Sequence, residues 1–141
     1  MKDTVLAWAA GFFDGEGYIT IPERQVTHKE KLYKSHYIRL GINHVDPRPL
    51  RKLHLMFGGT LQENVKTTGN RHPRCQWQLS CQEAKNFLNC VRPYLVNKDI
   101  AADLALQFFE TISLNKKQLS IETIRLRQDL STRLKLVNSL S

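Results

Sequence analysis

Apolar and polar residues alternate along two stretches in the first third of the chain. In residues 35–43, Ile38, Leu40 and Ile42 fall on one side and mostly polar residues fall on the other. Residues 18–26 alternate in the same way, although less regularly. A period of two residues is typical of a β-strand with one face in the core and one face in solvent. The pattern therefore predicts two strands that share a polar face.

Two more strands are predicted later in the chain, over residues 60–66 and 74–80. In the second of these, Cys75 and Trp77 lie on the apolar side, and arginine and glutamine side chains lie on the other. Residues 27–34, which connect the first two strands, are highly charged and contain no comparable apolar side. We expect that connection to be a mobile linker.

Helical signals occur before, between and after these strands. Five helices are predicted, over about 3–15, 47–57, 81–95, 98–113 and 121–139. Asp3 or Thr4 can cap the first helix, and Asp46, which a proline follows, can cap the second. Ser80 and Glu83 have the spacing of a capping box at the start of the third.

The predicted order is α-β-β-α-β-β-α, followed by further helices. Such an order is typical of an α+β fold, in which helices cover one face of an antiparallel sheet. The chain has 141 residues, and domains average about 150 residues. We expect a single domain over 1–141, with a core over about 3–113 and a C-terminal helix over about 120–139.

The net positive charge of the chain indicates which class of molecule it binds. Lys and Arg number 21 against 13 Asp and Glu, which gives a formal net charge of +8. An excess of this size on a small domain favours a polyanion, most often a nucleic acid. The three cysteines form no metal-binding spacing, and no apolar run approaches the ~20 residues of a membrane span. We expect a soluble intracellular protein, in a bacterial or archaeal cytoplasm or an organelle interior, without a membrane partner.

The polar side of the predicted sheet supplies the candidate nucleic-acid contacts. Arginine, glutamine and asparagine can hold phosphates and read base edges, whereas the alternative is a face that is only solvated. The candidates on the strands and their turns are Thr20, Arg24, Tyr37, Arg39, Gly41, Asn43, Gln62, Asn64, Lys66, Arg71, Arg74, Gln76 and Gln78.

The first helix carries small residues at a helical spacing. Ala7, Gly11 and Gly15 recur at every fourth position, which places them on one face. Glycine inside a helix costs about 1 kcal/mol relative to alanine, so its presence suggests close packing against another backbone. That backbone belongs either to the core of this chain or to a second copy across a two-fold axis.

Two carboxylates stand where the first helix ends. Asp14 and Glu16 lie at the negative end of the helix dipole, where acidic groups are unfavourable. A bound cation would offset this cost, and oxygen ligands favour magnesium or calcium. The alternative is that both acids are solvated turn residues.

The sequence around these acids, AAGFFDGEGYI over residues 9–19, resembles the LAGLIDADG motif of homing endonucleases. The resemblance rests on Ala10, Gly11, Asp14 and Gly17, with an acid at position 16. The order of elements over about 5–112 is also similar to that of the family. Only one copy of the motif is present, which in this family implies a homodimer with a saddle-shaped antiparallel sheet in each subunit.

The resemblance implies roles for individual residues. Glu16, beside Gly15, corresponds to the metal-binding acid, with two or three Mg²⁺ ions per dimer. Ala7, Gly11, Asp14 and Gly15 correspond to the dimer interface. Lys98 corresponds to the catalytic basic residue, while His44 corresponds to a residue that positions water and Arg48 is a further candidate for contact with the scissile phosphate. The implied reaction is a staggered double-strand cut in a long, near-palindromic DNA target. An intron-RNA maturase and a non-catalytic DNA-binding regulator remain alternatives.

Overall fold

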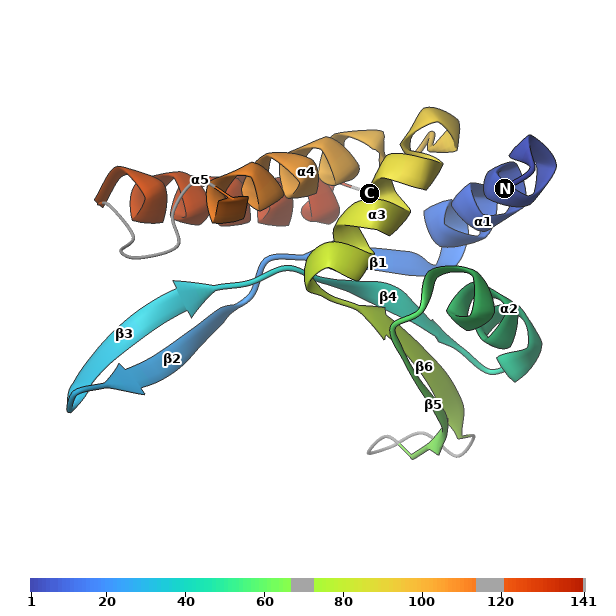
Figure 1. Cartoon of the computed structure of the whole chain (residues 1–141), viewed down its shortest axis with the longest axis horizontal. Helices are drawn as coiled ribbons and strands as arrows, with labels where there is room; N and C mark the ends of the chain where they lie inside the picture. Colours follow the sequence, from blue (N-terminus) through green and yellow to red (C-terminus); the bar gives the residue numbers. More distant parts are fainter. Residues whose placement is uncertain (67–72, 114–120, 141) are drawn as a thin grey trace.

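The computed structural model describes residues 1–66, 73–113 and 121–140 of the chain (Figure 1). Its elements, in chain order, are α1 (Asp3–Glu16), β1 (Gly17–Thr20), β2 (Glu23–His28), β3 (Lys31–His36), β4 (Arg39–His44), α2 (Pro47–Phe57), β5 (Thr60–Val65), β6 (Arg74–Leu79), α3 (Cys81–Val91), the 3-10 turn η1 (Arg92–Tyr94), α4 (Asp99–Ser113) and α5 (Ile121–Ser139). None of these helices combines the length and the hydropathy that crossing a bilayer requires.

Four strands form an antiparallel sheet in the order β1-β4-β6-β5. The helices gather on one side of this sheet, and its other side is left open by the described elements (Figure 1). The alternation in the sequence sets the two faces, because Ile42 and Trp77 pair across the strands and are fully buried toward the helices. The predicted α+β fold is therefore confirmed.

The core lies between the sheet and the helices. Phe87 of α3 occupies its centre, where its ring makes edge contacts with Phe13, Phe57 and Trp77 at centroid distances of 4.8–5.3 Å. These rings come from α1, α2, β6 and α3, so one aromatic cluster fixes three helices onto the sheet. Trp77 also donates a hydrogen bond from its indole nitrogen to the carbonyl oxygen of Gly58.

A second sheet replaces the predicted mobile linker. Strands β2 and β3 form an antiparallel hairpin that projects from the four-stranded sheet (Figure 1). The predicted strand over 18–26 is wrong in extent because β1 ends at Thr20 and Pro22 separates it from β2. Proline has no N–H to donate to a strand ladder, so the pairing partner changes there. The predicted strand over 35–43 is divided in the same way between β3 and β4.

The helix boundaries test the predicted caps. Asp46 caps α2 as predicted, since its carboxylate accepts a hydrogen bond from the Arg48 N–H. The cap of α1 is wrong, because its N-cap is Lys2 and Asp3 lies within the first turn. Helix α3 follows Ser80 as predicted, but the capping box is wrong. The Ser80 side chain makes no capping bond, and the Glu83 carboxylate accepts from the Gly59 N–H at 2.7 Å. Helix α3 also ends at Val91, four residues earlier than predicted, and passes into η1.

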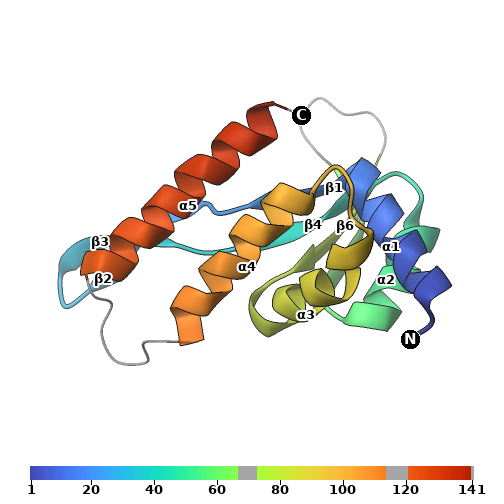
Figure 2. The same ribbon diagram turned by 90° about the horizontal axis from the view of Figure 1, so that it is seen from above.

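Helix α5 lies along α4 and against the outer edge of β1 (Figure 2). The hydroxyl of Ser131 donates to the Ile21 carbonyl oxygen at 2.8 Å, and Asn138 Nδ2 donates to the Ile19 carbonyl oxygen at 3.0 Å. Leu130 and Leu134 on the same helix are buried in the core. The C-terminal helix is therefore joined to the edge strand by both polar and apolar contacts.

Candidate functional site

The last turn of α1 presents a free carboxylate to solvent. Glu16 is the final helical residue and is exposed. Gly17 follows without a side chain because a Cβ there would overlap the ring of Phe13. The Glu16 carboxylate makes no hydrogen bond or ion pair with any described residue. In the same described ranges, His, Cys, Asp and Glu form no group of three that could hold a metal ion. A single chain thus offers one exposed hard oxygen ligand at this helix end, which fits a cation whose remaining ligands come from elsewhere.

Asp14 has a different role from Glu16. Its carboxylate accepts hydrogen bonds from two backbone N–H groups, those of Val96 at 2.7 Å and Lys98 at 3.0 Å. Both groups precede α4, so Asp14 joins the end of α1 to the loop before that helix. A carboxylate occupied in this way is a structural group, and it leaves Glu16 as the acid that is available to a cation.

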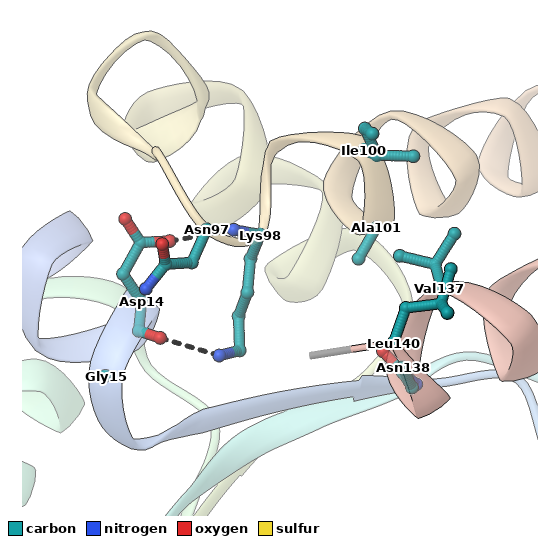
Figure 3. A pocket seen from close by; sticks show the side chains of 9 residues that line it. All are labelled: Asp14, Gly15, Asn97, Lys98, Ile100, Ala101, Val137, Asn138 and Leu140. Atoms are coloured by element: carbon teal, nitrogen blue, oxygen red, sulfur yellow. Dashed lines mark hydrogen bonds between the residues drawn. The ribbon is translucent and has the colours of Figure 1, made fainter.

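Lys98 lies against the same turn of α1. Its ammonium donates to the carbonyl oxygen of Asp14 at 2.7 Å (Figure 3). Burial lowers the pKa of Lys98, while the negative charges of Asp14 and Glu16 act in the opposite direction. The structure thus brings together Glu16 and Lys98, two of the residues predicted for the site.

A cavity of about 700 Å³ adjoins Lys98. Asp14, Gly15 and Asn97 line it beside Lys98, and the opposite wall comes from α4 and α5 (Figure 3). That wall includes Ile100 and the end of α5, neither of which the sequence analysis had assigned to the site. The sequence contains no signal for these lining residues, because their position beside Lys98 depends on where α5 packs.

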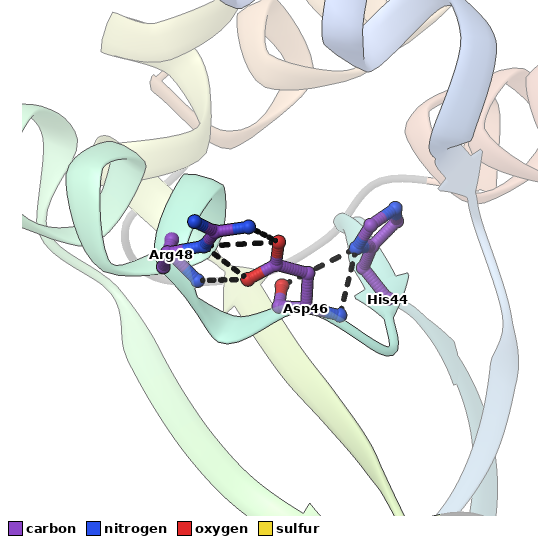
Figure 4. Close-up of polar contacts among 3 residues, drawn as sticks. All are labelled: His44, Asp46 and Arg48. Atoms are coloured by element: carbon purple, nitrogen blue, oxygen red, sulfur yellow. Dashed lines mark hydrogen bonds and ion pairs between the residues drawn. The ribbon is translucent and has the colours of Figure 1, made fainter.

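His44 and Arg48 both interact with Asp46, which lies between them (Figure 4). His44 Nδ1 lies 3.0 Å from the backbone nitrogen and 3.2 Å from the carbonyl oxygen of Asp46, so the Asp46 backbone engages Nδ1 and Nε2 is the other ring nitrogen. The ring also makes an edge contact with Phe12 of α1 at 5.4 Å. Phe12 lies one helical turn before Glu16 on α1.

Arg48 is engaged within the chain. Its guanidinium donates to both oxygens of the Asp46 carboxylate, at 3.0 Å from Nε to Oδ1 and 2.6 Å from Nη2 to Oδ2. The hydrogen bonds from the Arg48 side chain and backbone lower the pKa of Asp46 to about 2. For Arg48 to contact a phosphate, its guanidinium would therefore have to leave the Asp46 carboxylate or bind both anions at once.

The open face of the sheet carries most of the predicted contact residues in register. Three rows cross the strands, and their members are Thr20 and Arg39; Tyr18, Gly41, Gln78 and Thr60; and Asn43, Gln76 and Gln62. Tyr18 and Thr60 were not among the predicted residues, although the alternation with Ile19 and Leu61 could have identified them. Gly41 contributes no side chain, and a Cβ there would overlap the Trp77 carbonyl oxygen.

The remaining predicted contacts are more dispersed. Arg24 lies on the hairpin, where its guanidinium stacks 5.0 Å from the Tyr37 ring centroid. Asn64 has a positive φ of 61° at a β-bulge in β5, and Lys66 follows that strand. Arg74, at the start of β6, has a buried Nε without a hydrogen-bond partner among the described residues. Arg71 lies outside the described residues.

A groove of about 250 Å³ extends the polar face around the edge of β1. Thr20 and Arg39 line it from the sheet, and Lys135 and Asn138 line it from α5. Lys135 could not be assigned to this surface from the sequence, because nothing in the pattern of α5 indicates which strand the helix covers. The basic surface therefore continues from the sheet onto the C-terminal helix.

The face of α1 that carries the small residues is open. Ala7, Gly11 and Gly15 are exposed. A Cβ at Gly11 or at Gly15 would meet no atom within 4 Å. The glycines are therefore not required by packing within the described part of the chain, and this excludes the alternative in which they pack into its own core.

Comparison with known proteins gives a family and a set of similar folds. The model of the LAGLIDADG endonuclease family matches residues 9–113. No curated protein sequence matches the chain. The homing endonuclease I-CvuI, in complex with its target in the presence of 2 mM Ca, is 20% identical with a TM-score of 0.74, over 95% of this chain and 82% of that one. The archaeal intron-encoded homing endonuclease I-Vdi141I, complexed with DNA, is 14% identical with a TM-score of 0.78, over 97% and 86%. A mutant of I-SmaMI is 17% identical with a TM-score of 0.71, over 89% of this chain and 42% of the other.

Proposed function

The chain belongs to the LAGLIDADG endonuclease family, and on this premise we propose that it is a homing endonuclease that makes a staggered double-strand cut in one long, near-palindromic DNA target. The observation that carries this proposal is the position of Glu16. This exposed acid lies at the end of α1 next to Lys98. Tyr18, the first residue of the polar sheet face, follows two positions later. A carboxylate, an ammonium group and the polar face of the sheet thus adjoin one another.

The open face of α1 supports a homodimer. Ala7, Gly11 and Gly15 form a strip without side-chain bulk, so the same strip of a second copy could approach closely across a two-fold axis. Such an arrangement brings together two Glu16 carboxylates, one from each subunit. The isolated acid of a single chain then becomes part of a shared site.

The donor chemistry of that shared site fits Mg²⁺. Carboxylate oxygens are the ligands that hard divalent cations prefer, and Mg²⁺ binds through one or two of them while it retains waters. When bound, the metal would supply a nucleophilic water and stabilise the leaving 3′ oxygen. Glu16 would hold it, with the Gly15 backbone beside it, whereas Asp14 keeps its structural hydrogen bonds.

The neighbouring side chains would act on charge and protons. The Lys98 ammonium, held by the Asp14 carbonyl oxygen, would stabilise the negative charge that develops on the phosphate oxygens. Its lowered pKa also makes it a better proton donor than an exposed lysine. His44, with its Nδ1 engaged by the Asp46 backbone, would use Nε2 to orient a water. Arg48 would contribute only if DNA competes with Asp46 for its guanidinium.

The polar face would bind the duplex. Its glutamine, asparagine and arginine side chains match the donor and acceptor pattern of the major groove. The net charge of +8 favours phosphate contacts along the same surface. Lys135 of α5 extends this charge past the edge of β1, so the footprint would include the C-terminal helix.

The proposal is tested with a library of long DNA sites incubated with the protein in Mg²⁺, beside a Ca²⁺ control, followed by sequencing of the cut ends. We expect paired, staggered cuts at one near-palindromic site in Mg²⁺ only. Glu16→Gln should abolish cutting while binding is retained, because the amide keeps the shape but loses the charge that holds the metal. Glu122→Gln, at an exposed position in the first turn of α5, is the matched control and should cut normally.

Three results would contradict the proposal or part of it. Full activity of Glu16→Gln would remove this acid from the metal site. Tight DNA binding without cutting under any divalent metal would indicate a regulator. Selective binding of a structured RNA in place of DNA would indicate a maturase.

A further inference from the structure

The middle row of the polar face contains a hydrogen bond between two strands that are not neighbours. Gln78 Nε2 of β6 donates to Tyr18 Oη of β1 at 3.1 Å. Strand β4 lies between them, with Gly41 at the position opposite both residues. Neighbouring strands are about 4.8 Å apart, so the two side chains bridge roughly 10 Å across the sheet.

Gly41 makes this bridge possible. It has no side chain to fill the position between Tyr18 and Gln78 on the polar face. The backbone of the neighbouring strand β6 fixes the glycine, because a Cβ there would overlap the Trp77 carbonyl oxygen. The gap in the row is therefore a fixed part of the strand packing, and the Tyr18 and Gln78 side chains meet across it.

The hydrogen bond determines which groups of the Gln78 amide remain available. An amide nitrogen carries two hydrogens, and Tyr18 accepts only one of them. Oε1 and the second N–H make no hydrogen bond with any residue that the structure describes, so both are available to a ligand on the open face. This pair of one acceptor and one donor matches the N6 and N7 groups that adenine presents in the major groove. An amide in the reverse orientation, with Oε1 against Tyr18, would present only donors and would suit guanine.

On the basis of the proposed function, we propose that Tyr18 is a positioning residue for base recognition. Its hydroxyl fixes the amide of Gln78 so that Gln78 selects adenine at one base pair in each half of the DNA target. Tyr18 lies two residues after Glu16, so this base pair belongs to the inner part of the half-site, toward the cut. Without the hydroxyl, the amide can rotate and present either edge to the DNA.

The test measures kcat/KM for targets that carry each of the four bases, one position at a time, in the half-sites. The position read by Gln78 is the one whose preference disappears in Gln78→Ala. At that position the wild-type protein should prefer adenine by roughly 5- to 150-fold, the range expected for a bidentate contact. Tyr18→Phe, which retains the ring, should reduce that preference by roughly 2- to 10-fold, the range expected for one hydrogen bond. Preferences at other positions should stay the same.

A double-mutant cycle separates positioning from direct contact. If Tyr18 acts through Gln78, then Tyr18→Phe should cause no further change at this base pair in the Gln78→Ala background. Tyr94→Phe is the matched control, since the Tyr94 hydroxyl bonds to Asp3 on the helix side of the sheet, and it should leave the preference intact. Thermal unfolding of each variant checks that the fold is retained.

Several outcomes would overturn the inference. A preference for guanine at this position would show that the amide has the opposite orientation. An unchanged adenine preference in Tyr18→Phe, or additive effects in the cycle, would show that Tyr18 does not position Gln78. Each of these outcomes is a ratio of kcat/KM values between targets that are cut. If the proposed function fails, no target is cut at all, so the two failures are distinguishable.

Discussion

Replacing Asp14 with alanine removes the carboxylate that joins the end of α1 to the loop before α4. Two backbone N–H groups, those of Val96 and Lys98, then lose their acceptor. Hydrogen bonds to charged groups contribute about 1.5–3 kcal/mol each when they are shielded from water. Val96 is exposed, so water replaces part of the loss, and we expect Asp14→Ala to lower the free energy of unfolding by about 2–3 kcal/mol. For a chain of this length the change corresponds to a decrease in Tm of about 6–10 °C.

Urea denaturation at fixed protein concentration measures this change, because binding of a second copy would otherwise alter the apparent stability. Asp14→Asn keeps one acceptor oxygen and should lose about half as much. Asp129→Ala is the control, since it removes an exposed pair with Arg133 and should cost at most about 0.5 kcal/mol. The error of such a measurement is roughly 0.5 kcal/mol. If the free energy of unfolding of Asp14→Ala differs from that of the wild-type protein by no more than this, Asp14 does not stabilise this junction.

Three further predictions concern the dimer, the DNA footprint and one ion pair. Gly11→Leu should make the protein monomeric in sedimentation velocity, because its side chain would fill the open strip on α1; a persistent dimer would place the interface elsewhere. Lys135→Ala should reduce the slope of log K against log salt by about 2 units per dimer, one phosphate per subunit. Lys85→Ala on α3, on the helix side, should leave the slope unchanged, and equal effects would refute a contact from α5. The Asp46 carboxyl should have a pKa near 2 by NMR in the wild-type protein, and this pKa should rise in Arg48→Ala but stay below the ordinary value of 3.8, because the backbone N–H at position 48 still donates to Asp46. The folded-state pKa is the lower one, so the pair stabilises the fold above about pH 4 and the contribution disappears as the pH falls through 2; an unshifted wild-type titration would exclude the pair in solution.

The features that sequence predicted well are those in which local pattern and burial coincide. Leu40 and Ile42 alternate with polar residues because β4 has one buried face, and they and Ile38, which immediately precedes the strand, are at most 4% exposed. The α2 cap was predictable because Asp46 acts on a residue only two positions away. Lys98 lies against the last turn of α1, whereas its catalytic role came from the family resemblance and stays a prediction.

The features that sequence analysis missed depend on contacts between distant segments. The hairpin β2–β3 is solvated along much of its length, so its residues lack the apolar side that marks a strand. Glu83 has the spacing of a capping box, but its carboxylate contacts Gly59, 24 residues away along the chain. Lys135 belongs to the candidate DNA surface only because α5 packs against β1. A periodic pattern contains no information about which strand a helix will cover.

Two hydrogen bonds from α5, to β1 and to the residue that follows it, protect the edge of the sheet from self-association once α5 has packed. An edge strand with unpaired carbonyl groups is a template for another strand, and exposed edges of this kind promote aggregation. Ser131 and Asn138 occupy the carbonyl oxygens of Ile21 and Ile19 with side chains, which cannot propagate a ladder. Because α5 is synthesised about a hundred residues after β1, this edge stays open until α5 has been synthesised. A chain truncated before Ser131 should therefore aggregate during expression, even though every strand of the sheet is present.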